Sequence, residues 1–143
     1  MQPFPHHYRA AIELEADDGD VVLRSPGLPE LRTAPPAEYG GPGDRWSPET
    51  LLVGAVADCY VLGFRAIAAA SKLEWSALSC EVEGTLEKVE KRVRFTRIAI
   101  RATVTVPPAV ASSAERILHK AEEVCLVTNS LSASTEFSGS VRH

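Results

Sequence analysis

A long apolar segment constrains the fold of this chain more than any other feature. From Leu51 to Ala70 the residues are apolar on nearly every helical face, interrupted mainly by Asp58 and Arg65. The segment is long enough to cross a bilayer, but a charge near its middle is expensive in lipid, and its many alanines give weak hydrophobicity. We therefore expect a helix buried at the centre of a soluble protein, with no membrane span.

The residues before this segment predict where the helix begins. Ser47 is a favourable N-cap, because its hydroxyl can accept a hydrogen bond from a free amide of the first turn. Pro48 fits the first helical position, where its missing N–H costs nothing. Glu49 then lies in the first turn, where the helix dipole favours a carboxylate. The predicted helix extends from Ser47 to Lys72.

Cys59 lies in the middle of this helix on an apolar face. Ala55 and Gly63 flank it one turn away on either side, and such small residues allow another backbone to approach closely. Free cysteine is among the most buried residue types, so Cys59 could be an inert core thiol. The helix alone leaves an inert thiol and a reactive thiol equally open.

Length and charge limit the class of protein. The 143 residues fit one domain, 1–143, and the net charge of −4 without a basic stripe argues against a nucleic-acid partner. Three cysteines without a secretory signal indicate a reducing, cytoplasmic compartment, where thiols are catalytic, metal-binding or merely buried. The acidic cluster at 17–20 lacks EF-hand spacing and the adjacent His6 and His7 face opposite ways on a strand, so we expect no metal site.

The hydrophobic periodicity predicts an α+β fold with the order β-β-α-β-β-α-β and mostly antiparallel strands. A turn at Asp17–Asp20 should join the first two strands as a hairpin, and a β-bulge or a switch of face is expected near Arg97. Ser112 or Ser113 should cap the second helix. The predicted strands are His7–Ala16, Val21–Arg24, Ser76–Glu87, Val93–Val106 and Ser132–Val141, with a loop from Ser25 to Trp46.

The other two cysteines occupy different positions. Cys80 is one of the alternating residues on the inner face of a predicted strand, whereas Cys125 lies at the buried end of the second helix. A redox pair needs two thiols whose Cα atoms come within about 7 Å. A buried thiol also needs a cation to become a thiolate, and a carboxylate can hold an arginine in place for this purpose. Glu49 is the candidate carboxylate.

Two segments of the chain resemble the OsmC/Ohr family of thiol peroxidases. They are APPAEYGGPGDRWSPETLLVGAVADCYVLGF and HKAEEVCLVTNSL, and the likeness covers most of the chain in the same order of elements. The Ser-Pro-Glu helix start and the two cysteines at this spacing carry it. The resemblance implies an OsmC-like fold and an intertwined homodimer whose long central helices pack at its core. It also implies active sites near the dimer interface.

The resemblance further implies a reaction and its residues. Cys59 would be the peroxidatic thiolate, and Cys125 the resolving thiol that closes a disulfide. Glu49 would orient an activating arginine, and an external thiol or dithiol would reduce the disulfide without any cofactor. An apolar lining suits a bulky organic hydroperoxide better than hydrogen peroxide, and its predicted members are Leu51, Leu52, Tyr60 and Phe64.

The sequence departs from the family pattern in two places. The second cysteine is often followed by proline in the family, but here it is followed by Leu126. No arginine falls on the two positions that the family uses, so the candidates are Arg45, which is nearest Glu49 in sequence, then Arg32 and Arg24. A second function therefore stays open, that of a dimeric module that binds an apolar ligand or senses redox state with little turnover.

Overall fold

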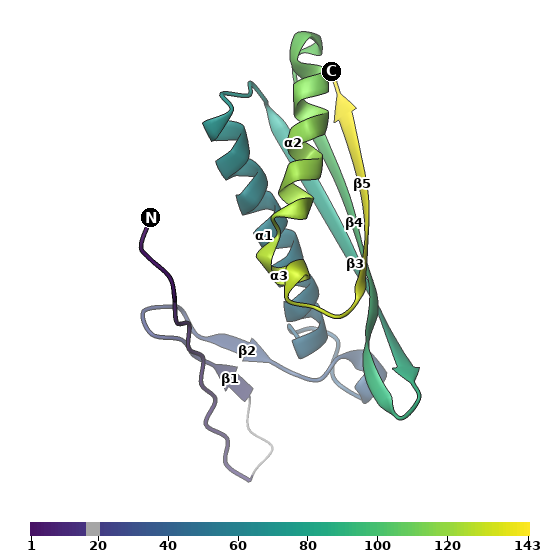
Figure 1. Ribbon diagram of the computed structural model, residues 1–143. Coiled ribbons are helices and arrows are strands. Elements are labelled where there is room, and N and C mark those ends of the chain that lie inside the picture. Colours follow the sequence, from purple (N-terminus) through teal and green to yellow (C-terminus); the bar gives the residue numbers. More distant parts are fainter. Residues whose placement is uncertain (17–20) are drawn as a thin grey trace. The chain divides into compact units, whose positions relative to one another are not determined.

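The structure is a computed structural model that describes residues 1–16 and 21–143 (Figure 1). The chain divides into two compact units, Met1–Leu51 and Leu52–His143, and each is described by itself. The order of the main elements is β-β-α-β-β-α-β, with one further short helix before the last strand, and it matches the predicted order although the first two strands are not both the predicted ones.

The first unit contains a small antiparallel sheet of β1, Val21–Leu23, and β2, Leu31–Thr33. Strand β2 and the 3-10 helix Ala37–Tyr39 both lie within the segment that the sequence predicts to be a loop. Gly40 follows that helix with φ 79°, a left-handed conformation that glycine adopts without steric cost.

The predicted strand from His7 to Ala16 is wrong for this chain. Only Ala11 pairs, through two backbone hydrogen bonds of 2.9 and 3.0 Å with Arg24, and the predicted turn at 17–20 lies outside the described residues. Side chains on the predicted apolar face, including Tyr8, Ile12 and Leu14, are exposed. An alternating segment becomes a strand only where a sheet edge accepts it along its length, and here the antiparallel pairing is limited to Ala11 and Arg24.

Helix α1, Pro48–Ala70, begins as its sequence predicts. The Thr50 N–H donates to Ser47 Oγ at 3.2 Å, and the Ser47 N–H donates to Thr50 Oγ1 at 2.8 Å, a reciprocal cap of the first turn. Past the other end, Lys72 adopts a left-handed conformation with φ 53°. By length and composition α1 is the one helix among the described residues that could cross a membrane, a criterion that core helices of soluble proteins also meet.

The second unit contains a three-stranded sheet in the order β3-β4-β5. Strands β3, Ala77–Val89, and β4, Arg92–Thr105, form an antiparallel hairpin, and β5, Ser134–Arg142, lies parallel to β4. The pairing shifts after Thr85, which confirms the predicted irregularity near Arg97.

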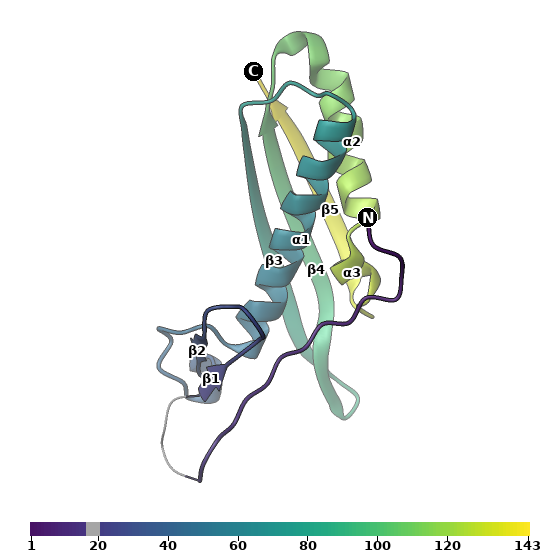
Figure 2. The same cartoon turned by 90° about the vertical axis from the view of Figure 1, so that its left-hand side faces the viewer.

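Helix α2, Ala111–Glu123, and the short α3, Leu126–Asn129, complete this unit. The predicted serine cap is wrong, because the 3-10 helix Pro108–Val110 leads directly into α2 and Val110 occupies the cap position without a side-chain hydrogen bond. Helices α1 and α2 both lie on one face of the sheet (Figures 1 and 2).

The core of the second unit lies between these helices and the sheet. Each element contributes one apolar face, with β4 supplying the most deeply buried strand residues, which include Ile98, Ile100 and Val104. The close approach of α1 to the sheet depends on Gly84, where an added Cβ would lie 2.9 Å from Val53 Cγ2 and 2.7 Å from a ring atom of Phe95. The helical residues of the core are Val56, Tyr60, Phe64, Ala68, Ala114, Ile117, Leu118 and Ala121.

Candidate functional site

The second unit brings two of the three thiols together. Cys59 lies on α1 and is half-buried, and Cys125 lies in the connection between α2 and α3 with 1% of its surface exposed. Both are free thiols, and Cys125 is near enough to Cys59 to raise the pKa of its thiol. Residues 66 positions apart in the chain thus form a pair of the kind that a thiol–disulfide couple requires.

Hydrogen bonds to both sides of Cys125 hold the second thiol in place. The Cys125 N–H donates to the Glu122 carbonyl oxygen at 3.1 Å. The Cys125 carbonyl oxygen accepts from the Asn129 N–H at 3.0 Å and from Thr128 Oγ1 at 3.1 Å. Cys125 is the N-cap residue of α3 and has extended backbone angles, φ −64° and ψ 102°. The end of α2 and the start of α3 therefore fix its position together.

The surroundings of Cys59 act on its thiol in opposite directions. Burial raises the pKa of Cys59, because an apolar environment disfavours the thiolate, and the neighbouring Cys125 raises it further. Hydrogen bonds from the backbone N–H groups of Val127 and Leu126 lower that pKa, because they favour the charged sulfur. No arginine or lysine of the second unit is among the groups that act on Cys59.

Cys80 is the third thiol of this region. It lies half-buried on β3 against the core, as its place in the alternating pattern predicts. Burial, followed by the effect of Cys125, raises the pKa of Cys80 to about 11. Cys80 is therefore a neutral thiol near neutral pH. Among the described residues, no group of three or more His, Cys, Asp and Glu side chains could hold a metal ion.

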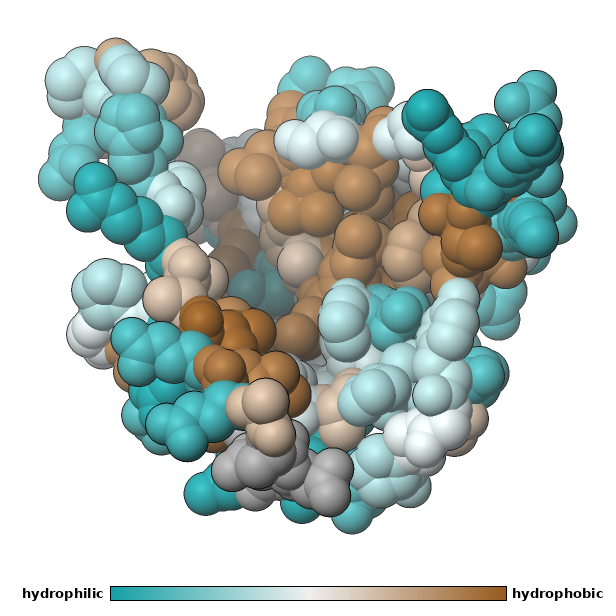
Figure 3. All heavy atoms as spheres, turned by 90° about the horizontal axis from the view of Figure 1, so that it is seen from below, coloured by the Kyte–Doolittle hydropathy of each residue, from teal (hydrophilic) through white to brown (hydrophobic). Residues whose placement is uncertain are grey.

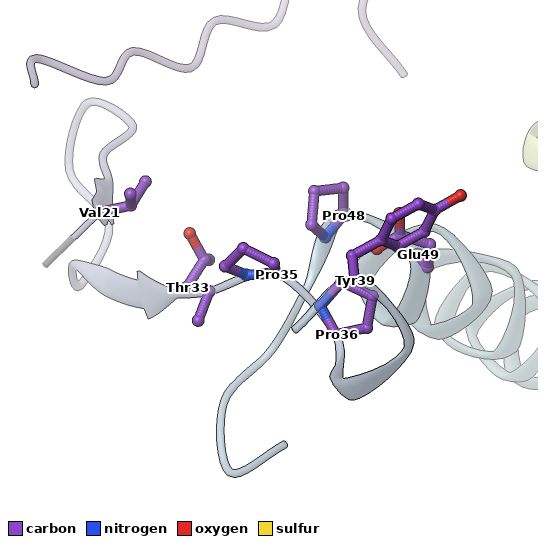
Figure 4. A pocket seen from close by; sticks show the side chains of 8 residues that line it. Val21, Thr33, Pro35, Pro36, Tyr39, Pro48 and Glu49 are labelled. Carbon is purple, nitrogen blue, oxygen red and sulfur yellow. The ribbon is translucent and has the colours of Figure 1, made fainter. Parts of the chain in front are cut away.

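A separate feature of the first unit involves Glu49. Its side chain lies at an apolar pocket of about 340 Å³, which Figure 4 shows between the start of α1 and the Pro35-Pro36 segment. The Glu49 Oε2 atom is buried without a hydrogen-bond partner. Buried carboxylate oxygens are almost always paired, so this one is available to a further donor. The pocket is lined by Val21, Thr33, Ala34, Pro35, Pro36, Tyr39, Pro48 and Glu49.

The candidate arginines all belong to the first unit. Arg24 is paired with Glu30, with 2.7 Å between its Nε and Glu30 Oε1. Arg32 and Arg45 also make interactions of their own. The unpaired Oε2 of Glu49 has none of the three as a hydrogen-bond partner.

Two of the residues predicted to line a substrate pocket are core residues instead. Tyr60 and Phe64 have no exposed surface. The Phe64 ring packs edge-on against Trp75, with 5.5 Å between the ring centroids. Of the other two, Leu52 is partly buried against the same core, and Leu51 belongs to the first unit. Residues spaced by four along α1 fall on the stripe that covers the sheet, and this placement corrects the predicted lining.

Sequence reasoning missed the backbone donors beside Cys59. Backbone N–H groups have no side-chain signature, so the sequence gives no sign of their effect on the Cys59 pKa. One sequence signal does exist at this place. Residue 126 is leucine where the resembling family often has proline, so this chain has an N–H that proline lacks.

The chain is similar in sequence to proteins of one family. The sequence model of the OsmC-like protein family matches residues 41–139, which is more than half of the chain. A curated relative, the uncharacterized protein YmaD of Bacillus subtilis, is 25% identical over 135 residues, which cover 92% of this chain and 90% of the relative.

Solved structures share the fold at low sequence identity. An OsmC-like protein of unknown function from Vibrio cholerae has a TM-score of 0.83 at 18% identity, over 94% of this chain and 99% of its own. An organic hydroperoxide resistance protein from Legionella pneumophila has a TM-score of 0.76 at 24% identity, over 99% of this chain and 100% of its own. One of the same description from Elizabethkingia anophelis has a TM-score of 0.77 at 16% identity, over 99% of each chain.

Proposed function

Because the chain belongs to the OsmC-like protein family, we propose that it is a cytoplasmic thiol-dependent peroxidase that reduces organic hydroperoxides. The observation that carries this proposal is the pairing of Cys59 with Cys125. Structural neighbours named as organic hydroperoxide resistance proteins support the same reaction class. The role would be defence against oxidative stress.

The proposed reaction has three balanced steps. The Cys59 thiolate attacks the outer oxygen of the hydroperoxide, the O–O bond breaks, and the alkoxide takes up a proton and leaves as an alcohol. The Cys59 sulfenic acid then condenses with the Cys125 thiol, which forms a disulfide and releases water. An external dithiol reduces that disulfide by exchange, becoming a disulfide itself, and both cysteines return to thiols.

An arginine completes this proposal. We assign thiolate activation to Arg45, with Arg32 and Arg24 as the other candidates, and assign Glu49 to hold that arginine by a bidentate pair. The unpaired Oε2 of Glu49 supports this role, since it leaves room for a guanidinium donor. Leu51 and Leu52, at the start of α1, would contribute the apolar surface that favours a bulky hydroperoxide.

We also propose an intertwined homodimer as the working form. Ala55, Leu62 and Ala66 recur at helical spacing on α1 and are exposed, and Leu62 keeps 50% of its surface open. The alternating apolar residues of the N-terminal segment are exposed too. Figure 3 shows hydrophobic residues exposed among hydrophilic ones. Exposed apolar surface of this kind marks association sites, and a second copy of the chain would cover it.

Thiol-dependent consumption of cumene hydroperoxide tests the function. The wild-type protein with a dithiol reductant should consume cumene hydroperoxide faster than hydrogen peroxide. Cys59→Ser should abolish the reaction, Cys125→Ser should stop turnover after one equivalent, and the matched control Cys80→Ser should retain it. Equal rates for wild type and Cys59→Ser would overturn the proposal.

A second candidate function is the binding of an apolar ligand, with the cysteines sensing redox state. The apolar pocket of about 340 Å³ in the first unit favours it, because ligand sites are typically concave and apolar with a few polar groups. Saturable binding of an apolar fluorescent probe without peroxide turnover would make this the better assignment. Turnover that depends on Cys59 would exclude it as the main function.

A further inference from the structure

One hydrogen bond joins the helix that carries Cys59 to the helix that leads to Cys125. The Tyr60 Oη donates to the Leu118 carbonyl oxygen at 3.2 Å, and both residues are buried. Among the described residues, it is the one hydrogen bond between α1 and α2. Tyr60 directly follows Cys59 on α1, and the helix that accepts the bond ends just before Cys125.

Packing holds the Tyr60 ring in the orientation that this bond needs. The ring packs against Phe137 on β5, with 5.7 Å between the centroids, and Phe137 also packs edge-on against His119 on α2 at 5.1 Å. Gly139 keeps room for this arrangement, because an added Cβ would lie 3.0 Å from the Phe137 ring and 3.3 Å from Leu118 Cδ1. Tyr60 therefore links α1 to both α2 and β5.

The backbone of Cys125 moves with α2 rather than by itself. Cys125 has 1% of its surface exposed, and its N–H donates at 3.1 Å to the carbonyl oxygen of Glu122, in the last turn of α2. The short α3 follows Cys125 directly, and Figures 1 and 2 both show α3 beside the middle of α1. The separation of Cys59 and Cys125 therefore depends on how α1 packs against α2.

We propose that Tyr60 is a positioning residue for the thiol pair, and that its hydrogen bond to Leu118 holds α1 and α2 at the spacing at which Cys125 closes a disulfide with Cys59. The inference rests on the proposed function and assigns a residue to its second step. A disulfide requires Cα atoms within about 7 Å and well-directed Cβ atoms, so a small shift between the helices slows its closure. Tyr60 has no exposed surface, so it acts through the helices and not on the hydroperoxide.

Loss of this hydrogen bond should affect one step of the reaction. Without it, α1 and α2 have more freedom in the dithiol state, and closure of the disulfide has to remove that freedom. Condensation of the Cys59 sulfenic acid with the Cys125 thiol should therefore slow, and the disulfide should become easier to reduce. The attack of Cys59 on the hydroperoxide should keep its rate, because Cys125 takes no part in it.

A matched pair of substitutions tests this role. Tyr60→Phe removes the hydroxyl and keeps the ring, whereas Ile100→Val shortens a buried side chain of β4 and leaves the bond between α1 and α2 in place. Both are small changes in the core of the second unit. Circular dichroism and denaturant unfolding would check that both variants fold and lose comparable stability.

The first measurement is the reduction potential of the thiol pair. The protein equilibrates with mixtures of dithiothreitol and its oxidised form, which exchange two electrons and two protons with the pair, and mass spectrometry of trapped peptides gives the fraction of Cys59–Cys125 disulfide. Tyr60→Phe should lower the equilibrium constant for disulfide formation about fivefold, the factor expected for one neutral hydrogen bond, which raises the potential by about 20 mV. Ile100→Val should keep the wild-type potential.

Two outcomes of this measurement would overturn the proposal. They are equal potentials for wild type and Tyr60→Phe, and an equal shift in Ile100→Val. No hydroperoxide is consumed in the measurement, so the result does not depend on peroxidase activity and is separate from the test of the proposed function.

The second measurement follows the condensation step directly. One equivalent of cumene hydroperoxide is added, and dimedone traps the Cys59 sulfenic acid at timed intervals. The sulfenic acid should last about five times longer in Tyr60→Phe than in wild type or Ile100→Val, by the same factor for one hydrogen bond, while all three consume the hydroperoxide equally fast. A sulfenic acid that decays equally fast in Tyr60→Phe and wild type would refute the positioning role.

Discussion

The phenolic Oη of Tyr60 on α1 donates a hydrogen bond of 3.2 Å to the carbonyl oxygen of Leu118 on α2. Both residues are buried, and they lie one residue after Cys59 and seven residues before Cys125. The bond therefore fixes the two helices against each other close to both thiols. The Tyr60 ring also packs against the ring of Phe137 on β5, with 5.7 Å between the two ring centroids.

Tyr60→Phe should lower the free energy of unfolding by about 1 kcal/mol. The substitution removes one neutral buried hydrogen bond and keeps the ring packing, and the Leu118 carbonyl keeps its place in the helical pattern. Denaturant unfolding measures the change. Tyr60→Leu, which also removes ring volume, should cost more, and a Tyr60→Phe protein as stable as wild type would contradict this role.

Peroxide treatment should join Cys59 to Cys125 in a reversible intrachain disulfide and leave Cys80 free. Cys125 is near enough to Cys59 to raise its pKa, whereas burial keeps Cys80 protonated and slow to react. Peptide mapping before and after a dithiol reductant checks both the pairing and its reversal. A peroxide-induced bridge that contains Cys80 would refute the assignment.

Arg45→Ala should raise the pH needed to alkylate Cys59 and slow peroxide reduction. A cation within about 4–6 Å favours a thiolate, so its loss makes the charged form harder to reach. Glu49→Gln should act in the same direction but more weakly, because it releases the arginine rather than removing it. Arg32→Ala and Arg24→Ala are the comparisons. If none of the three arginine variants moves the alkylation profile, the arginine part of the mechanism fails.

Stability should fall as pH rises from about 9 to about 11. The pKa of Cys80 is about 11 in the folded protein, above the ordinary value of 9.0, so the folded state binds more protons than the unfolded state in this window. The contribution is fully present below pH 9 and is lost as pH rises through 11. The raised pKa of Cys59 acts in the same direction.

Cys80→Ala isolates the contribution of Cys80. Its unfolding free energy should decline less steeply than that of wild type across this window, by less than the about 2.7 kcal/mol of two pKa units, because solvent screens the half-buried thiol. Denaturant unfolding at several pH values, starting from a matched value near neutrality, measures the difference. Identical slopes for the two proteins would show that the Cys80 thiol titrates normally.

The protein should be a homodimer at micromolar concentration, with an interface of more than about 2,000 Å² in total. Leu62→Glu places a charge on the exposed apolar stripe of α1 and should shift the protein toward monomers. Leu62→Ala, which stays apolar, should remain dimeric. Light scattering measures the mass, and a monodisperse wild-type monomer would contradict the proposed assembly.

Local sequence determined the elements that make their own contacts. The cap at Ser47 needs only Thr50, three residues away, so the start of α1 follows from the sequence. Strand β3 could be predicted because its apolar and polar residues alternate with a period of two. The shift in pairing after Thr85 could be predicted because the apolar residues of β4 change from one face of the strand to the other. The two cysteine motifs could likewise be recognised in the sequence as similar to the OsmC/Ohr family, because each is a short, continuous segment.

Tertiary structure decided what depends on residues far apart in the chain. The segment 7–16 alternates like a strand, but β1 pairs with β2, and no local pattern states which edge is available. Tyr60 and Phe64 were predicted from the resemblance to line a pocket, and the structure buries both side chains in the core. The effect of the Leu126 and Val127 backbone on the Cys59 pKa also depends on folding, because these residues lie far from Cys59 in the chain.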